Sequence, residues 1–258
     1  MIRSETTPST DSRLSTLPAE VAAALEQLRT ELRAAAGENL TGLILYGSAA
    51  RDRYRPGQSD VNVLVLLADV SCRALDALAP ALRTAWRAYR IEPFVVTREE
   101  LCRLTDVFPI KILEMQAHHL VLDGDDPFDE LPISNEHLRL RTEQQLRNLL
   151  FRLRRRYLSI GGDRSELAEV LADSSRSLAV SLAMVARLAG QTLTETTQTA
   201  GALRTVGESL HLDGSVLERM AALRRTTEVP DDIASLYEAV LGNIRQAVDI
   251  VDRLEPSR

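Results

Sequence analysis

Strand-like apolar runs occur only in the first half of this chain, and that distribution limits the folds open to it. Four such runs are short, rich in Val, Ile and Leu, and bounded by residues that favour turns: 40–46, 61–67, 91–97 and 119–122. Apolar residues at helical spacing predict one helix before the first run, over 18–36, and two between the later runs, over 71–89 and 109–116. Strands that alternate with helices in this way indicate an α/β (α+β) domain.

The second half of the chain has a different pattern. After about residue 133 no strand-like alternation is evident, and helical periodicity runs over 135–160, 165–190, 198–211, 213–225 and 231–254. The turn cluster DGDDP at 123–127 marks the boundary. We therefore predict a polar, disordered tail at 1–16, the α/β domain at 17–132 and an all-helical bundle at 133–258.

Composition argues against several classes of partner. The net charge of −6 does not favour attraction to nucleic acid or anionic lipid. No window approaches the run of about 18 apolar residues that a membrane span needs, and residues 1–16 lack the apolar core of a signal peptide. Cys72 and Cys102 form no CxxC pair and no disulfide framework. We expect a soluble, cytoplasmic protein without a membrane or nucleic-acid partner.

Lysine is almost absent from the chain. Lys111 is the only one, so the other 30 of the 31 basic residues are arginines. Arginine presents a fixed fork of donors that suits phosphates and carboxylates. Codon usage in a GC-rich genome explains the same bias, so the arginine content does not by itself indicate a function.

The stretch from residue 43 to residue 65 carries the strongest functional pattern. A buried strand ends in Gly47-Ser48, where glycine allows close backbone approach to a ligand and serine adds a hydroxyl group and an amide donor. A polar loop leads to a second strand that begins Asp60-Val61-Asn62. Alternate residues of a strand point the same way, so Asp60 and Asn62 share a face. Their oxygens, beside a phosphate cradle, would hold a hard cation such as Mg²⁺.

This stretch resembles the signature of the nucleotidyltransferase superfamily, which includes the aminoglycoside nucleotidyltransferases and the minimal nucleotidyltransferases of bacteria. The signature is Gly-Ser, a loop of about ten residues, then Ser-Asp-x-Asp and an apolar strand. Here Gly47-Ser48 is followed by eleven residues and then by Asp60-Val61-Asn62. Glu92, near the start of the third strand, looks like the family's third acid. The resemblance covers roughly residues 20–125 and implies a nucleotidyltransferase fold, with a short mixed sheet and flanking helices.

The resemblance also implies a reaction and the residues that carry it. The reaction is the Mg²⁺-dependent transfer of a nucleoside monophosphate from an NTP to a small-molecule or protein acceptor. The implied metal ligands are Asp60, Asn62 and Glu92, and the implied catalytic residues are Asp60 and Glu92. Nucleotide binding is expected at Gly47 and Ser48, and at Arg51, because a guanidinium group so close to the turn can contact a phosphate.

Asn62 is the main departure from the signature, which has an Asp at this position. Asn offers a neutral carbonyl oxygen, and bridging two cations is a task for a carboxylate, so we expect a second Mg²⁺ to bind weakly or not at all. Two alternatives therefore stand beside the enzyme: a nucleotide-binding pseudoenzyme with a regulatory role, and a toxin–antitoxin component. The acceptor, the nucleobase and the oligomeric state are left open by the sequence.

Overall fold

The chain folds into two compact units, residues 1–133 and 134–258. The structure, a computed structural model, describes residues 14, 16–51, 53–57, 59–129, 131–191 and 200–254. Most of the tail predicted at 1–16 lies outside these residues, although Leu14 is described and is buried in the core of the first unit. Each unit has its own buried core, so the two are described separately.

A four-stranded mixed sheet forms the centre of the first unit. Its strands are β1 (Leu40–Tyr46), β2 (Val61–Leu67), β3 (Ile91–Thr97) and β4 (His119–Gly124), in the order β3-β2-β1-β4. Strand β1 is antiparallel to both β2 and β4, whereas β2 and β3 are parallel. The end of β1 and the starts of the other three strands therefore meet at one edge of the sheet, and the predicted mixed sheet is confirmed.

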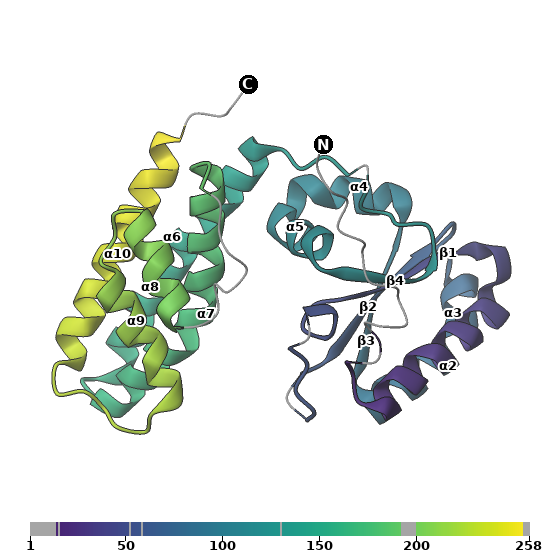
Figure 1. Ribbon diagram of the computed structural model, residues 1–258, viewed down its shortest axis with the longest axis horizontal. Coiled ribbons are helices and arrows are strands. Elements are labelled where there is room, and N and C mark those ends of the chain that lie inside the picture. Colours follow the sequence, from purple (N-terminus) through teal and green to yellow (C-terminus); the bar gives the residue numbers. More distant parts are fainter. Residues whose placement is uncertain are drawn as a thin grey trace, which may run out of the picture. The chain divides into compact units, whose positions relative to one another are not determined.

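Helices cover both faces of this sheet (Figure 1). They are α2 (Ala19–Ala36) and α3 (Cys72–Tyr89) on one face, and α4 (Arg98–Val107) and α5 (Pro109–Ala117) on the other. Helix α4 was not predicted from the sequence. Its signal was present, because Thr97 and Glu100 form a capping box in which each side chain accepts a hydrogen bond from the other's backbone amide.

The alternation of side chains along the strands divides the apolar residues of the first unit between two clusters. Leu43, Leu45 and Val63 pack beneath α2 and α3. Ile44 and Leu64, one position away, pack beneath α4 and α5. Burial of apolar surface contributes about 25 cal/mol per Å², so both clusters stabilise the sheet.

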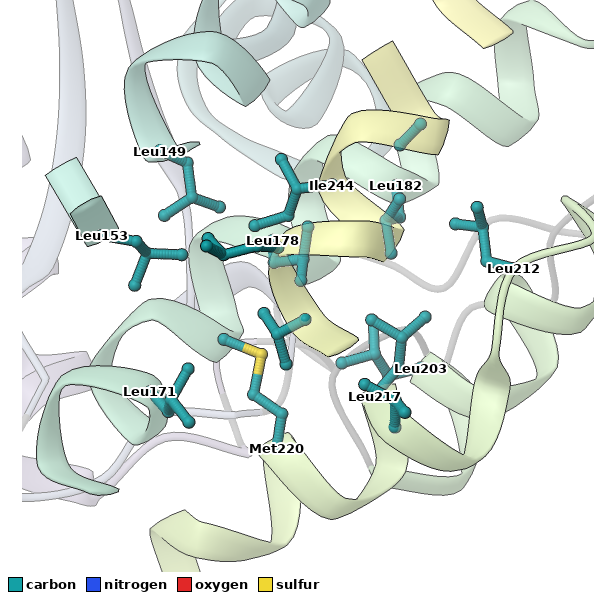
Figure 2. Close-up of a cluster of buried hydrophobic side chains, with 14 of the residues drawn as sticks. Leu149, Leu153, Leu171, Leu178, Leu182, Leu203, Leu212, Leu217, Met220 and Ile244 are labelled. Atoms are coloured by element: carbon teal, nitrogen blue, oxygen red, sulfur yellow. The ribbon is translucent and has the colours of Figure 1, made fainter. Parts of the chain in front are cut away.

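The second unit is entirely helical in its described residues, as predicted. Its helices are α6 (Asn135–Ile160), α7 (Arg164–Leu188), α8 (Ala200–Ser209), α9 (Gly214–Ala222) and α10 (Ile233–Arg253). Figure 2 shows their core, where Leu149 of α6, Leu178 of α7 and Ile244 of α10 point toward one another. No helix in the described part of the chain is long and apolar enough to cross a membrane.

Candidate functional site

The turn after β1 is shaped by Gly47 and Ser48. Gly47 has a φ of 80°, in the left-handed region that favours glycine. The Ser48 carbonyl oxygen accepts hydrogen bonds from the backbone amides of Arg51 (3.3 Å) and Arg53 (3.0 Å). These bonds accompany one turn of 3-10 helix over residues 49–51, directly after Ser48.

Gly47 also lies directly against Asn62. A Cβ atom at position 47 would lie 3.0 Å from the Asn62 Nδ2 atom, closer than side-chain contacts normally allow. The predicted turn and the predicted ligand position at the start of β2 are therefore in contact. Two independent features, the positive φ and the close approach, favour glycine at this position.

Asn62 and Glu92 are neighbours across the parallel pair β2–β3. They are register partners, and Asn62 is at the same time the register partner of Tyr46 on β1. Register partners project to the same face of a sheet, so these three side chains share the face that α4 and α5 cover. Glu92 is exposed and Asn62 is half-buried, which leaves the group within reach of a ligand.

Asp60, immediately before β2, forms an ion pair that the sequence did not predict. The Arg90 Nε atom donates a hydrogen bond to the Asp60 Oδ1 atom at 2.6 Å. The hydrogen bond and the charge of Asp60, with a smaller effect of Glu92, raise the pKa of Arg90 above its usual value. Both carboxylates therefore lie within electrostatic range of one guanidinium group.

Tyr46 and Lys111 complete the polar end of this face, and neither was predicted as a site residue. Burial, and secondly the charge of Glu92, raise the pKa of Tyr46 to about 12. Partial burial lowers the pKa of the Lys111 ammonium group, and Glu92 opposes that shift. The sequence offered one signal for Lys111, since it is the only lysine of the chain.

Arg51 reaches from the turn toward α5. Its guanidinium group lies 3.7 Å from a carboxylate oxygen of Glu114. The Arg51 Nε atom is buried, and among the described residues it has no hydrogen-bond partner. A buried donor without a partner costs about 1–3 kcal/mol, so an acceptor from an anionic ligand would satisfy it. This observation suits the phosphate-binding role predicted for Arg51.

His119, the first residue of β4, is a register partner of Tyr46 but is already fully engaged. Its Nε2 atom lies 2.7 Å from an Asp126 carboxylate oxygen, and its ring packs against Phe128. Its Nδ1 atom lies 3.0 Å from the Met115 carbonyl oxygen. These contacts hold the His119 ring in place.

The side chains at this edge offer oxygen atoms of the kind that bind a divalent cation. Asp60 and Glu92 offer carboxylate oxygens and Asn62 offers an amide oxygen, which are ligands that Mg²⁺ accepts. The described residues contain no group of three or more His, Cys, Asp or Glu side chains placed to hold a metal ion. With Asn at position 62, no carboxylate is available there to bridge two cations.

Comparison with known proteins yields a match in structure and none in sequence. No protein-family model matches the chain, and no curated protein sequence matches it. Among solved structures, the chain is similar to spectinomycin adenyltransferase AAD(9) from Enterococcus faecialis, solved with ATP and spectinomycin, with a TM-score of 0.50. The two are 14% identical, and the match covers 86% of this chain and 98% of that chain. The likeness shows that this chain shares its fold with that adenyltransferase.

Proposed function

We propose that the first unit binds a nucleoside triphosphate at the Gly47 turn and transfers its nucleoside monophosphate to a small-molecule or protein acceptor. The observation that carries this proposal is the meeting of Gly47, Asn62 and Glu92 at one sheet edge, in a fold shared with an adenyltransferase. That neighbour was solved with ATP and a small molecule, which supports the same two classes of ligand here.

In this proposal the turn binds the phosphates. Gly47 allows backbone amides to approach them closely, because it carries no Cβ atom. The Ser48 hydroxyl and the Arg51 guanidinium donate hydrogen bonds to phosphate oxygens, and the buried Arg51 Nε atom gains a partner.

Both carboxylates help to hold the cation, and Glu92 has a second task. Asp60, with the Asn62 amide oxygen and Glu92, would hold one Mg²⁺, which neutralises charge on the triphosphate. Asp60 must exchange its hydrogen bond from Arg90 for this cation. Glu92 is exposed and accepts the proton of the acceptor hydroxyl, whose oxygen attacks the α-phosphorus as pyrophosphate leaves.

A second candidate is nucleotide binding without transfer, with a regulatory role. Two observations favour it: position 62 lacks a carboxylate, and Asp60 is paired with Arg90. Both lower the negative charge available for cations, and transfer depends on cations more than binding does. Pyrophosphate release separates the two candidates.

The test is calorimetric titration of the full chain with the four NTPs, with and without Mg²⁺. Asp60→Ala should abolish Mg²⁺-dependent binding without unfolding the protein, because it removes the main metal ligand. Asp76→Ala, which removes an exposed acid near the start of α3, is the matched control and should bind as the wild type does. Equal binding by wild type and Asp60→Ala would exclude this site. Reducing buffer is used because Cys72 and Cys102 are exposed free thiols, which suits the cytoplasmic setting we propose.

Asn62→Asp decides between transfer and binding alone. If the protein has lost transfer, the added carboxylate should tighten metal binding by about 1 kcal/mol or more, and pyrophosphate release should appear with a suitable acceptor. If the protein works with one cation, the wild type should release pyrophosphate already, and Asn62→Asp should add little. Equal metal affinity of the two proteins would show that residue 62 does not contact the cation.

A further inference from the structure

The only lysine of the chain lies over the polar end of the sheet. The Lys111 Nζ atom is 4.0 Å from the centroid of the Phe94 ring and 5.9 Å from that of Tyr46. Phe94 follows Glu92 by two positions on β3, and Tyr46 is the register partner of Asn62. The ammonium group is therefore held on the same face as Asn62 and Glu92, beside the position where a signature carboxylate is missing.

The surroundings of Lys111 suit a cation that must meet an anionic ligand. The two rings attract its charge through their faces, and Glu92 lies within electrostatic range. The ammonium group is partly desolvated, so it gives up little hydration when it binds phosphate. The residue is nevertheless exposed, and it is the only basic residue of α5.

We propose that the Lys111 ammonium group contacts the phosphates of the bound nucleotide and supplies positive charge in place of a second divalent cation. This inference rests on the proposed nucleotide site. A second divalent cation needs a bridging carboxylate to hold it, and position 62 has an amide. An ammonium group tethered to a helix needs no ligand of that kind. A single cation and Lys111 are then sufficient to bind the triphosphate.

The first experiment measures affinity for the α,β-methylene analogues of ATP, GTP, CTP and UTP in Mg²⁺, by calorimetry on the full chain. Lys111→Met should weaken binding roughly tenfold, since it removes one charge-assisted contact. Lys111→Arg should retain most of the affinity. Arg103→Met is the matched control, because Arg103 is an exposed residue of α4 that pairs with Glu99, and it should bind as the wild type does. Affinity for the corresponding nucleosides should be the same in all four proteins.

The second experiment is a double-mutant cycle with Asn62→Asp. Bound Mn²⁺ is counted by electron paramagnetic resonance in the presence of the analogue. The wild type should hold one ion and Asn62→Asp two. In the Asn62→Asp background, Lys111→Met should weaken binding by roughly twofold or less, because the second ion then supplies the charge.

Protection of Lys111 from acetylation can be measured on the wild-type protein and needs no variant. Lys111 is the only side-chain amine, so acetylation by an amine-reactive ester is read at one peptide by mass spectrometry. The triphosphate analogue should protect Lys111, and the nucleoside should not.

The outcomes separate the two proposals. If wild type binds the analogue while Lys111→Met and Arg103→Met bind it equally well, the role of Lys111 is refuted and the nucleotide site stands. Equal loss for nucleoside and triphosphate, or equal loss in both backgrounds of the cycle, also refutes it. If wild type binds none of the four analogues, the proposed function fails and the role of Lys111 fails with it.

Discussion

The two faces of the sheet are built from the same four strands but differ in what they bury. The face beneath α2 and α3 is apolar along its whole length, with Val61 and Val63 of β2 fully buried. The face beneath α4 and α5 is apolar only in its middle, around Ile44 and Leu64. At its edge it carries Tyr46, Asn62, Glu92 and the Lys111 ammonium group.

This difference shows how one strand can serve stability and chemistry at once. Alternate residues of β2 face opposite sides, so Val63 packs in one core while Asn62 stands in a polar site. A charged ligand site needs polar groups that would be costly in a sealed core. Placing them at the strand ends of one face leaves the other face free to hold the sheet together.

The sharpest test of the contrast between the two faces introduces an aspartate at each of two adjacent positions of β2. Val63→Asp should cost more than about 4 kcal/mol of unfolding free energy, because it places an unpaired carboxylate in a fully apolar core. Asn62→Asp should cost about 1 kcal/mol or less, mainly through repulsion by Glu92 across the strand pair. Urea unfolding followed by the fluorescence of Trp86, the only tryptophan, reports on the first unit alone. Similar losses at the two positions would contradict the assignment of the faces.

A smaller loss of unfolding free energy is expected at Gly47, where the turn after β1 contacts Asn62. Gly47→Ala should lower the free energy of unfolding by about 2 kcal/mol, because alanine is strained in the left-handed backbone conformation and its Cβ atom displaces the Asn62 amide. Gly57→Ala is the matched control, because its φ of 75° imposes the same backbone cost and its Cβ atom would meet no described atom within 4 Å. It should cost about 1 kcal/mol. The same unfolding assay measures both, and equal costs would show that the contact with Asn62 adds nothing.

The sequence predicted the strands well, because each is a short apolar run ended by a turn residue. The apolar middle of each strand followed from local pattern alone. Helix α4 was missed because the apolar content of 98–107 is low, and its capping box was the better signal. Helix α3 contacts the sheet along a narrow line through Leu78 and Ala85, so Leu75 and Trp86 of the same helix are exposed.

The sequence motif named candidate site residues but not the side chains that pair with them. Gly47 and Asn62 were named from one motif, and their contact bears on that motif directly. The pairing of Arg90 with Asp60 depends on the register of β2 against β3, a long-range property without a local signal. The position of Lys111 over Phe94 depends on how α5 packs on the sheet, which side-chain spacing within the helix does not encode.

The smallest expected effect is on the pH dependence of stability, and it is caused by Tyr46 at the polar end of this face. Burial, with Glu92 as the lesser cause, raises the pKa of Tyr46 from its usual 10 to about 12, so the folded state resists its ionisation. Its contribution to stability is complete below pH 10 and is lost as the pH rises from 10 toward 12. In Tyr46→Phe this fall in the urea midpoint should be reduced, whereas Tyr89→Phe, which alters an exposed tyrosine of α3, should keep it.

Glu92→Gln then separates the two causes of the Tyr46 shift. It should reduce the fall in stability only in part, because burial is the larger cause and remains in the variant. Lys111 works in the opposite direction, since its lowered pKa makes the folded state more stable as the ammonium group loses its proton. Lys111 and Glu92 are unchanged in Tyr46→Phe and Tyr89→Phe, so the difference between those two variants isolates Tyr46. In Glu92→Gln the pKa of Lys111 also falls, because the charge that opposed its lowering is gone. If Glu92→Gln removed the fall as fully as Tyr46→Phe does, the charge of Glu92 and not burial would control Tyr46. The ionisation of Tyr46 would then be opposed mainly by the negative charge of Glu92, and only weakly by the removal of its side chain from water.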